Sequence, residues 1–129
     1  MKLGEIYCFV SEKAIGYQSR KKYHIYICES DWRDANVGHL FLFVSKADYG
    51  GDYPIKKSDY GFFDLEVSYV SCGRTIFYSD EELKQIKLEP LGSLNLGHLK
   101  ELYSFVANSN TMERGKIKLV CEAIKPLLA

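Results

Sequence analysis

The stretch His39-Leu40-Phe41-Leu42-Phe43-Val44-Ser45 decides the fold, because its five central residues are all apolar. Successive side chains of a β-strand point to opposite faces, so such a run places apolar groups on both faces. The segment Ile25-Tyr26-Ile27-Cys28 repeats the pattern. We therefore expect two strands at the centre of the fold, either bent across a core or covered by helices on their outer side.

Several other short runs are rich in Val, Ile, Tyr and Phe and are separated by Gly, Asp, Ser and Lys, which is typical of strands joined by turns. The predicted strands are 4–10, 23–28, 39–45, 66–72 and 75–78. Segments 11–22 and 47–54 are rich in turn-forming residues, and we expect both to be mobile surface loops. The second of these loops is expected to be too polar to bury.

The last third of the chain changes to helical spacing. Ser79 is followed three residues later by Glu82, which is the spacing of a capping box. The predicted elements are a short helix after Ser79 to about Gln85, a strand at 86–88, a helix capped by Ser93 and running through Val106, and a helix from Thr111 to about Pro126. We expect one domain over residues 1–129, mainly β with C-terminal helices, with an antiparallel sheet or barrel at about 4–91 and helices at about 93–127.

Charge and composition restrict the functions that the chain can have. Seventeen basic and seventeen acidic side chains cancel, so contact with a nucleic acid requires a local basic patch. The N-terminus lacks a signal-peptide layout and an apolar run long enough to span a bilayer, so we expect a cytoplasmic protein without membrane contact. The four cysteines (Cys8, Cys28, Cys72 and Cys121) and the three histidines lack ligand spacing. We expect four buried thiols, no metal site and no cofactor.

Short motifs occur in an order that resembles the MazF/PemK family of toxin endoribonucleases, over about residues 4–108. They are Gly4-Glu5-Ile6-Tyr7, Ser19-Arg20-Lys21-Lys22 before a strand, Leu42-Phe43-Val44-Ser45-Lys46, Arg74-Thr75-Ile76, and Gly92-Ser93-Leu94 before a helix. In that family an arginine followed by proline opens the second strand and contributes to phosphodiester cleavage. Lys22 and Tyr23 stand at those positions here, and an alignment shifted by two residues would use Arg20 instead.

The resemblance implies a small SH3-like antiparallel barrel of the MazF/PemK/CcdB type, a homodimer, and the toxin of a type II toxin-antitoxin system. The implied activity is metal-independent cleavage of single-stranded RNA that leaves a 2′,3′-cyclic phosphate, and the implied partner is an antitoxin protein lying in the same groove. Such cleavage requires a base for the 2′-OH, a donor for the leaving oxygen and cations for the phosphate. Lys22 or Arg20 could neutralise the phosphate, Ser45 could donate a hydrogen bond, and His24, Asp48 or Asp52 could move protons.

RNA contacts outside the reacting centre are expected from Lys21, Lys46 and Arg74. Tyrosines in or near the predicted loops are candidates for base stacking, namely Tyr17, Tyr49, Tyr53 and Tyr60. Each assignment has a structural alternative: a solvated basic loop, a turn serine at Ser45, a packed His24, or an Arg74 paired with a carboxylate.

Two functional hypotheses follow for the whole chain. The first is the RNA-cleaving toxin. The second is a non-catalytic barrel that binds a macromolecular target, as the CcdB-type gyrase poisons do, or that serves as a phage or plasmid accessory protein. The first hypothesis predicts that Lys22 and Ser45 converge on one groove.

Overall fold

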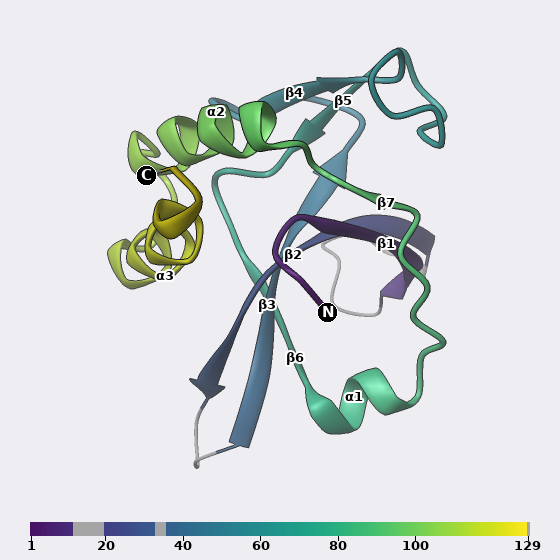
Figure 1. The fold of residues 1–129 in the computed structure, drawn as a ribbon, viewed down its shortest axis with the longest axis vertical. Helices are drawn as coiled ribbons and strands as arrows, with labels where there is room; N and C mark the ends of the chain where they lie inside the picture. Colours follow the sequence, from purple (N-terminus) through teal and green to yellow (C-terminus); the bar gives the residue numbers. More distant parts are fainter. Residues whose placement is uncertain (12–19, 33–35, 129) are drawn as a thin grey trace.

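The fold is a strongly curled antiparallel sheet with helices at both ends of the molecule (Figure 1). The computed structural model describes residues 1–11, 20–32 and 36–128, and of residues 20, 31, 32 and 36 only the main chain. The strands are β1 (Glu5–Ser11), β2 (Arg20–Trp32), β3 (Asn36–Ser45), β4 (Tyr53–Lys56), β5 (Val67–Val70), β6 (Ile76–Ser79) and β7 (Gly92–Ser93). The helices are α1 (Asp80–Lys84), α2 (Leu96–Ala107), α3 (Arg114–Ile124) and a final 3₁₀ turn, η2 (Lys125–Leu128).

Strands β2 and β3 form a long hairpin at the centre of the sheet. The strand order is β4-β5-β3-β2-β1-β7, and β6 also pairs with β3. All of these pairings are antiparallel. The predicted fold class, mainly β with a curled antiparallel sheet and C-terminal helices, is thus confirmed. Within the described residues, none of the helices is both long and apolar enough to cross a bilayer.

Each face of the central hairpin is covered by a separate hydrophobic core. On one face Ile25, Leu40 and Leu42 are fully buried beneath side chains of α2 and α3. On the other face Tyr26, Phe41 and Phe43 pack with residues of β1, β6 and α1, which are Tyr7, Phe9, Ile76, Tyr78 and Leu83. The expectation that both faces of these strands are buried is therefore confirmed, with helices covering one face and the curled sheet the other.

A β-bulge helps the sheet to curl. Tyr26 pairs with Phe41 and Cys28 pairs with Leu40, so β2 has one residue more than β3 between these two pairs. An extra residue bends its strand and increases the local twist.

The structure differs from the predicted elements where backbone pairing overrides local composition. The basic triplet Arg20-Lys21-Lys22 belongs to β2 and pairs with the end of β1, so it is not a surface loop. The expected strand at 86–88 is wrong, because the chain pairs with β1 only at Gly92 and Ser93. Segment 47–54 is exposed as predicted at 47–51 and at Pro54, but Asp52 and Tyr53 are buried, with exposed fractions of 5% and 3%.

Two of the three predicted helix starts are wrong. Ser93 lies in β7, and α2 is capped instead by Asn95, whose Oδ1 accepts the His98 N–H at 2.8 Å. Thr111 does not open α3, because its N–H bonds to the Ser109 hydroxyl and the helix begins after Glu113. The Ser79–Glu82 capping box at α1 is confirmed.

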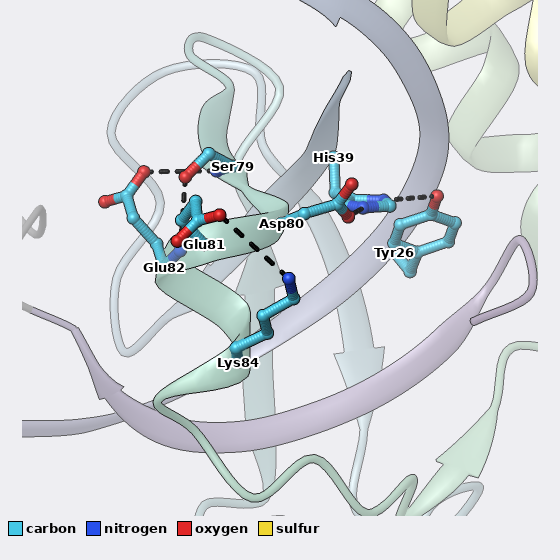
Figure 2. A network of polar contacts seen from close by, with 7 residues as sticks. All are labelled: Tyr26, His39, Ser79, Asp80, Glu81, Glu82 and Lys84. Carbon is cyan, nitrogen blue, oxygen red and sulfur yellow. Dashed lines mark hydrogen bonds and ion pairs between the residues drawn. The ribbon is translucent and has the colours of Figure 1, made fainter. Parts of the chain in front are cut away.

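A hydrogen-bonded chain joins the hairpin to α1 (Figure 2). The Tyr26 hydroxyl donates to Nδ1 of His39 at 3.0 Å, and Nε2 of His39 donates to the Asp80 carboxylate at 2.5 Å. Burial raises the pKa of Tyr26 to about 12, so this phenol remains a donor at neutral pH. These hydrogen bonds hold α1, with its buried Leu83, across the end of the core that contains Phe41 and Phe43, which we call the second core.

The cysteines are free thiols in different surroundings. Cys72 alone is buried, whereas Cys8, Cys28 and Cys121 are partly buried, so the expectation of four buried thiols is wrong for three of them. Burial raises the pKa of each thiol. These cysteines are therefore weak nucleophiles.

Gly38 is a position where a side chain would disrupt the packing of β6 on β3. A Cβ atom there would lie 1.7 Å from Cε1 of the Phe77 ring, so the whole ring would have to move. We expect Gly38→Ala to lower the free energy of unfolding by about 1–3 kcal/mol, measured by urea denaturation. Gly115→Ala is the control, because the added methyl group meets nothing within 4 Å and Ala favours the helix. Equal stability of the two variants would contradict this account of Gly38.

Candidate functional site

A cavity of about 420 Å³ opens where β3 ends, and we call it the central cavity. Its walls come from β2, β3, the loop before β4, the turn between β5 and β6, and the approach to α3. The lining residues are Lys22, Phe43, Ser45, Tyr49, Gly50, Asp52, Ser71, Gly73, Arg74 and Thr111. Lys22 and Ser45 therefore meet at one cavity, as predicted. Five of the predicted site residues (Lys22, Ser45, Tyr49, Asp52 and Arg74) are brought together here.

Two further cavities adjoin the central one. The strand-side cavity, of about 410 Å³, shares Lys22, Ser45 and Tyr49 with it and adds Lys21, Tyr23, Val44, Lys46, Asp64, Leu65 and Ser68. The helix-side cavity, of about 420 Å³, shares Gly73, Arg74 and Thr111 and adds Thr75, Ile76, Phe77, Met112, Glu113 and Lys116. Each of these two cavities shares three lining residues with the central cavity, and we call the three cavities together the groove.

The groove lies where β3 changes its pairing partner. Residues Gly38–Phe41 pair with β6, whereas Val44 and Ser45 pair with β5 along the same edge. Between these two pairings the Ser71 N–H donates to the Phe43 carbonyl at 2.8 Å, and the chain then turns away before β6 begins. The turn at 71–75 therefore stands beside the end of β3 and carries Arg74 into the groove.

Two aspartates shape the loop at 46–52. Oδ1 of Asp48 accepts the N–H groups of Gly50 and Asp52 at 2.8 and 3.1 Å, which lowers the pKa of Asp48. The buried Asp52 uses both oxygens: Oδ2 accepts the Tyr49 N–H and Oδ1 accepts the Cys72 N–H, each at 2.9 Å. Gly50 and Gly51 have positive φ angles of 116° and 83°, which suit glycine. The loop is thus built to present Tyr49, whose exposed fraction is 81%.

Cationic groups line the groove at intervals. The Lys22 ammonium lies 5.8 Å from the centroid of the Phe43 ring, and the Lys116 ammonium lies 5.1 Å from that of Phe77, both within cation–π range. Arg74 is exposed, and among the described residues no carboxylate pairs with its guanidinium. With Lys21 and Lys46, the lining cations outnumber the lining carboxylates of Asp52, Asp64 and Glu113. The groove is therefore a local basic patch on a chain with no net charge.

His24 lies outside this groove. It is fully buried in the second core, with its ring stacked on Phe9 at 3.9 Å between centroids. Nδ1 donates to the Lys22 carbonyl at 2.8 Å, and Nε2 accepts from the Tyr78 hydroxyl at 3.2 Å. Burial lowers the pKa of His24 from 6.5 to about 4, against a smaller opposing effect of the Lys22 carbonyl. This is the geometry of a packed, neutral histidine.

The remaining predicted residues are placed as follows. Lys21 and Lys46 line the strand-side cavity. The main chain of Arg20 pairs with Ser11, and its side chain lies outside the described residues, as does the whole of Tyr17. Tyr53 and Tyr60 are buried, and their hydroxyls bond to Glu101 and His98, so they do not serve as exposed stacking platforms.

Sequence reasoning missed the groove residues contributed by turns, above all Ser71, Thr111 and Glu113. They carry no motif and belong to segments far apart in the chain. A Cβ atom on Gly73 would lie 2.7 Å from the Thr111 hydroxyl, which shows how closely these segments approach. Only the three-dimensional structure brings them together.

Comparison of the chain with models of known protein families finds no match, and comparison with curated proteins finds none. The MazF/PemK resemblance therefore stays a prediction.

Substituting each aspartate of the loop at 46–52 by asparagine should have unequal effects. Asp52→Asn replaces one of two accepting oxygens by an NH₂ group facing an N–H, and we expect a loss of about 1–3 kcal/mol in unfolding free energy. Asp48→Asn is the matched control, because both of its bonds use one oxygen, which asparagine retains. Urea denaturation of the two variants measures the difference. A larger loss for Asp48→Asn would contradict these roles.

The burial of neutral His24 predicts a dependence of stability on pH. Because its folded pKa lies below its unfolded value, the stabilisation is complete above about pH 6.5 and is lost as the pH falls through about 4. The loss should reach about 3 kcal/mol, measured from urea midpoints between pH 7.5 and 4.

His24→Asn is the comparison variant, because it keeps a donor toward the Lys22 carbonyl but cannot take up a proton. It should show a flatter pH dependence than the wild type. Identical slopes in the two proteins would show that other groups cause the acid sensitivity.

Proposed function

We propose that the protein binds single-stranded RNA in the groove and cleaves it there without a metal ion, as the toxin of a toxin-antitoxin pair. The observation that carries this proposal is the convergence of Lys22, Ser45, Arg74 and Tyr49 on the central cavity. These are the residue types that RNA binding requires: cations for phosphate, a hydroxyl donor, and an exposed ring for a base. They come from three separate segments, with Ser45 and Tyr49 on one of them, so the meeting of Lys22 and Arg74 with that segment is not a consequence of chain proximity.

Phosphate recognition is assigned chiefly to Arg74. Its planar guanidinium can donate to two phosphate oxygens together, and it is exposed at the wall shared by the central and helix-side cavities. The Lys22 ammonium at the opposite shared wall supplies a second positive charge. Two cations flanking one cavity suit an extended strand whose successive phosphates follow the groove.

Base recognition is assigned to Tyr49. Its ring stands on a loop fixed by four hydrogen bonds to two aspartates. A rigid exposed ring can stack on any base, and such stacking is typically worth about 1–3 kcal/mol. Tyr49 lines both the central and the strand-side cavity, so a base stacked on it lies between the two.

For cleavage, Arg74 and Lys22 would stabilise the charge that grows on the phosphate during attack by the 2′-OH, and the Ser45 hydroxyl would donate to an oxygen of that group. A second function, RNA binding without cleavage, is favoured by one observation. The three candidate proton carriers are otherwise engaged: His24 is buried, and Asp48 and Asp52 each accept two backbone N–H groups. The experiment must therefore measure binding and cleavage separately.

We expect the purified protein to cleave a mixed-sequence single-stranded RNA in EDTA and to leave 2′,3′-cyclic phosphate ends, detected by gel analysis and mass spectrometry. Arg74→Ala, Lys22→Ala and Ser45→Ala should each reduce the rate, with a loss on the order of 10²-fold for a group that stabilises the reacting phosphate. Lys118→Ala is the control, because this exposed lysine lies on α3 outside the groove lining. Intact RNA at high protein concentration would reject cleavage.

Binding is tested separately by fluorescence anisotropy with 2′-O-methyl RNA, which cannot be cleaved by 2′-OH attack. Arg74→Ala should weaken binding and reduce the dependence of affinity on salt by about 0.7 in the logarithmic slope for one lost phosphate contact. Tyr49→Ala should weaken binding about 5- to 150-fold, whereas Tyr49→Phe keeps the ring and should change little. Absence of binding by the wild-type protein would reject the proposed function.

A further inference from the structure

The helix-side cavity extends the groove beyond the residues used so far. It shares Arg74 with the central cavity but is not lined by Tyr49, and its walls include Thr75 and Phe77 of the β5–β6 turn and β6, and Glu113 and Lys116 at the start of α3. Its volume of about 420 Å³ is within the range of ~300–1,000 Å³ typical of small-ligand sites. Because Arg74 lines both cavities, a strand whose phosphate is held there has room for a neighbouring nucleotide in this cavity.

Glu113 is an exposed acidic residue that lines this cavity. It is the N-cap of α3, yet its side chain makes no capping hydrogen bond, unlike Asn95 at α2. Among the described residues its carboxylate has no hydrogen-bond or ion-pair partner, although Arg74 and Lys116 line the same cavity. The carboxylate is therefore an acceptor that lines the cavity and is not engaged by the fold.

A carboxylate that contacts a polyanion would repel a phosphate, so a base is the part of the strand that it would contact favourably. A carboxylate accepts two hydrogen bonds side by side, and its natural complement among the bases is the Watson–Crick edge of guanine, with its adjacent N1–H and N2 amino donors. Uracil offers a single N3–H between two carbonyl oxygens, and these would repel Glu113. Phe77 and Met112 supply apolar walls for the ring of the base.

We infer that the helix-side cavity is a guanine-selecting subsite, in which Glu113 accepts hydrogen bonds from the Watson–Crick edge of the base while Arg74 and Lys116 hold the flanking phosphates. This inference rests on the proposed RNA binding and adds a base preference to it. Glu113 is thus a specificity-determining residue that contributes little to binding of the backbone.

The test uses uncleavable 2′-O-methyl hexamers in an anisotropy assay: oligo-uridine, the same oligomer with guanine at alternate positions, and a third with inosine, which lacks the N2 amino group, in place of guanine. The wild-type protein should bind the guanine oligomer about tenfold more tightly than oligo-uridine, with inosine between them. Glu113→Gln should lose most of this preference while keeping its affinity for oligo-uridine. Glu122→Gln, an exposed carboxylate of the same helix outside the groove lining, should behave as wild type.

The outcomes separate the two proposals. If all three hexamers bind in an Arg74-dependent manner and Glu113→Gln leaves the guanine preference unchanged, the guanine subsite is rejected and the RNA-binding groove stands. Absence of a guanine preference in the wild-type protein rejects the subsite in the same way. If none of the hexamers binds, the groove function and the subsite both fail.

Discussion

The burial of both faces of the β2–β3 hairpin is the constraint on which the rest of the structure depends. Leu40 and Leu42 point into one core, and Phe41 and Phe43 point into the other. Full burial of such side chains contributes roughly 1.5–3 kcal/mol each, so neither face can be left in water. A flat sheet alone would cover neither face. The chain covers one face with α2 and α3, and covers the other by curling β1 and β6 around it with α1 at the end (Figure 1).

This constraint explains why the fold was largely predictable from sequence. Alternation and uninterrupted apolar runs identified the central strands, because side-chain period in a strand is a local property. The whole of β4 and the short β7 were not predicted, since Tyr53–Lys56 becomes a strand by pairing with β5, and Gly92 and Ser93 become one by pairing with β1. The helix start at Asn95 was missed for the same reason: Ser93 is an equally good cap by type, and its place in the sheet excludes it.

The site was predictable only where its residues end or begin strands. Lys22 and Ser45 were placed correctly because β2 and β3 are neighbours, so residues at adjacent strand ends meet. His24 was a candidate because of its residue type and position. Strand alternation places its side chain on the face of β2 opposite to Ile25, where it packs in an aromatic cluster. Thr111 and Glu113 reach the groove through packing of α3 on the sheet, and no local pattern encodes that contact.

Because the chain has no net charge, the affinity of the groove for a polyanion depends on how its side chains are arranged. A chain whose charges cancel has no long-range field to attract a polyanion, and in physiological salt even its local field decays within about 8 Å. Affinity must therefore come from groups already in position when the ligand arrives. Asp52 supplies that preorganisation, because one oxygen holds the backbone of Tyr49 and the other holds Cys72, two residues before Arg74. A single buried carboxylate thus fixes the stacking loop relative to the turn that carries the phosphate-binding arginine, and its two N–H partners offset its charge without using a cation of the groove.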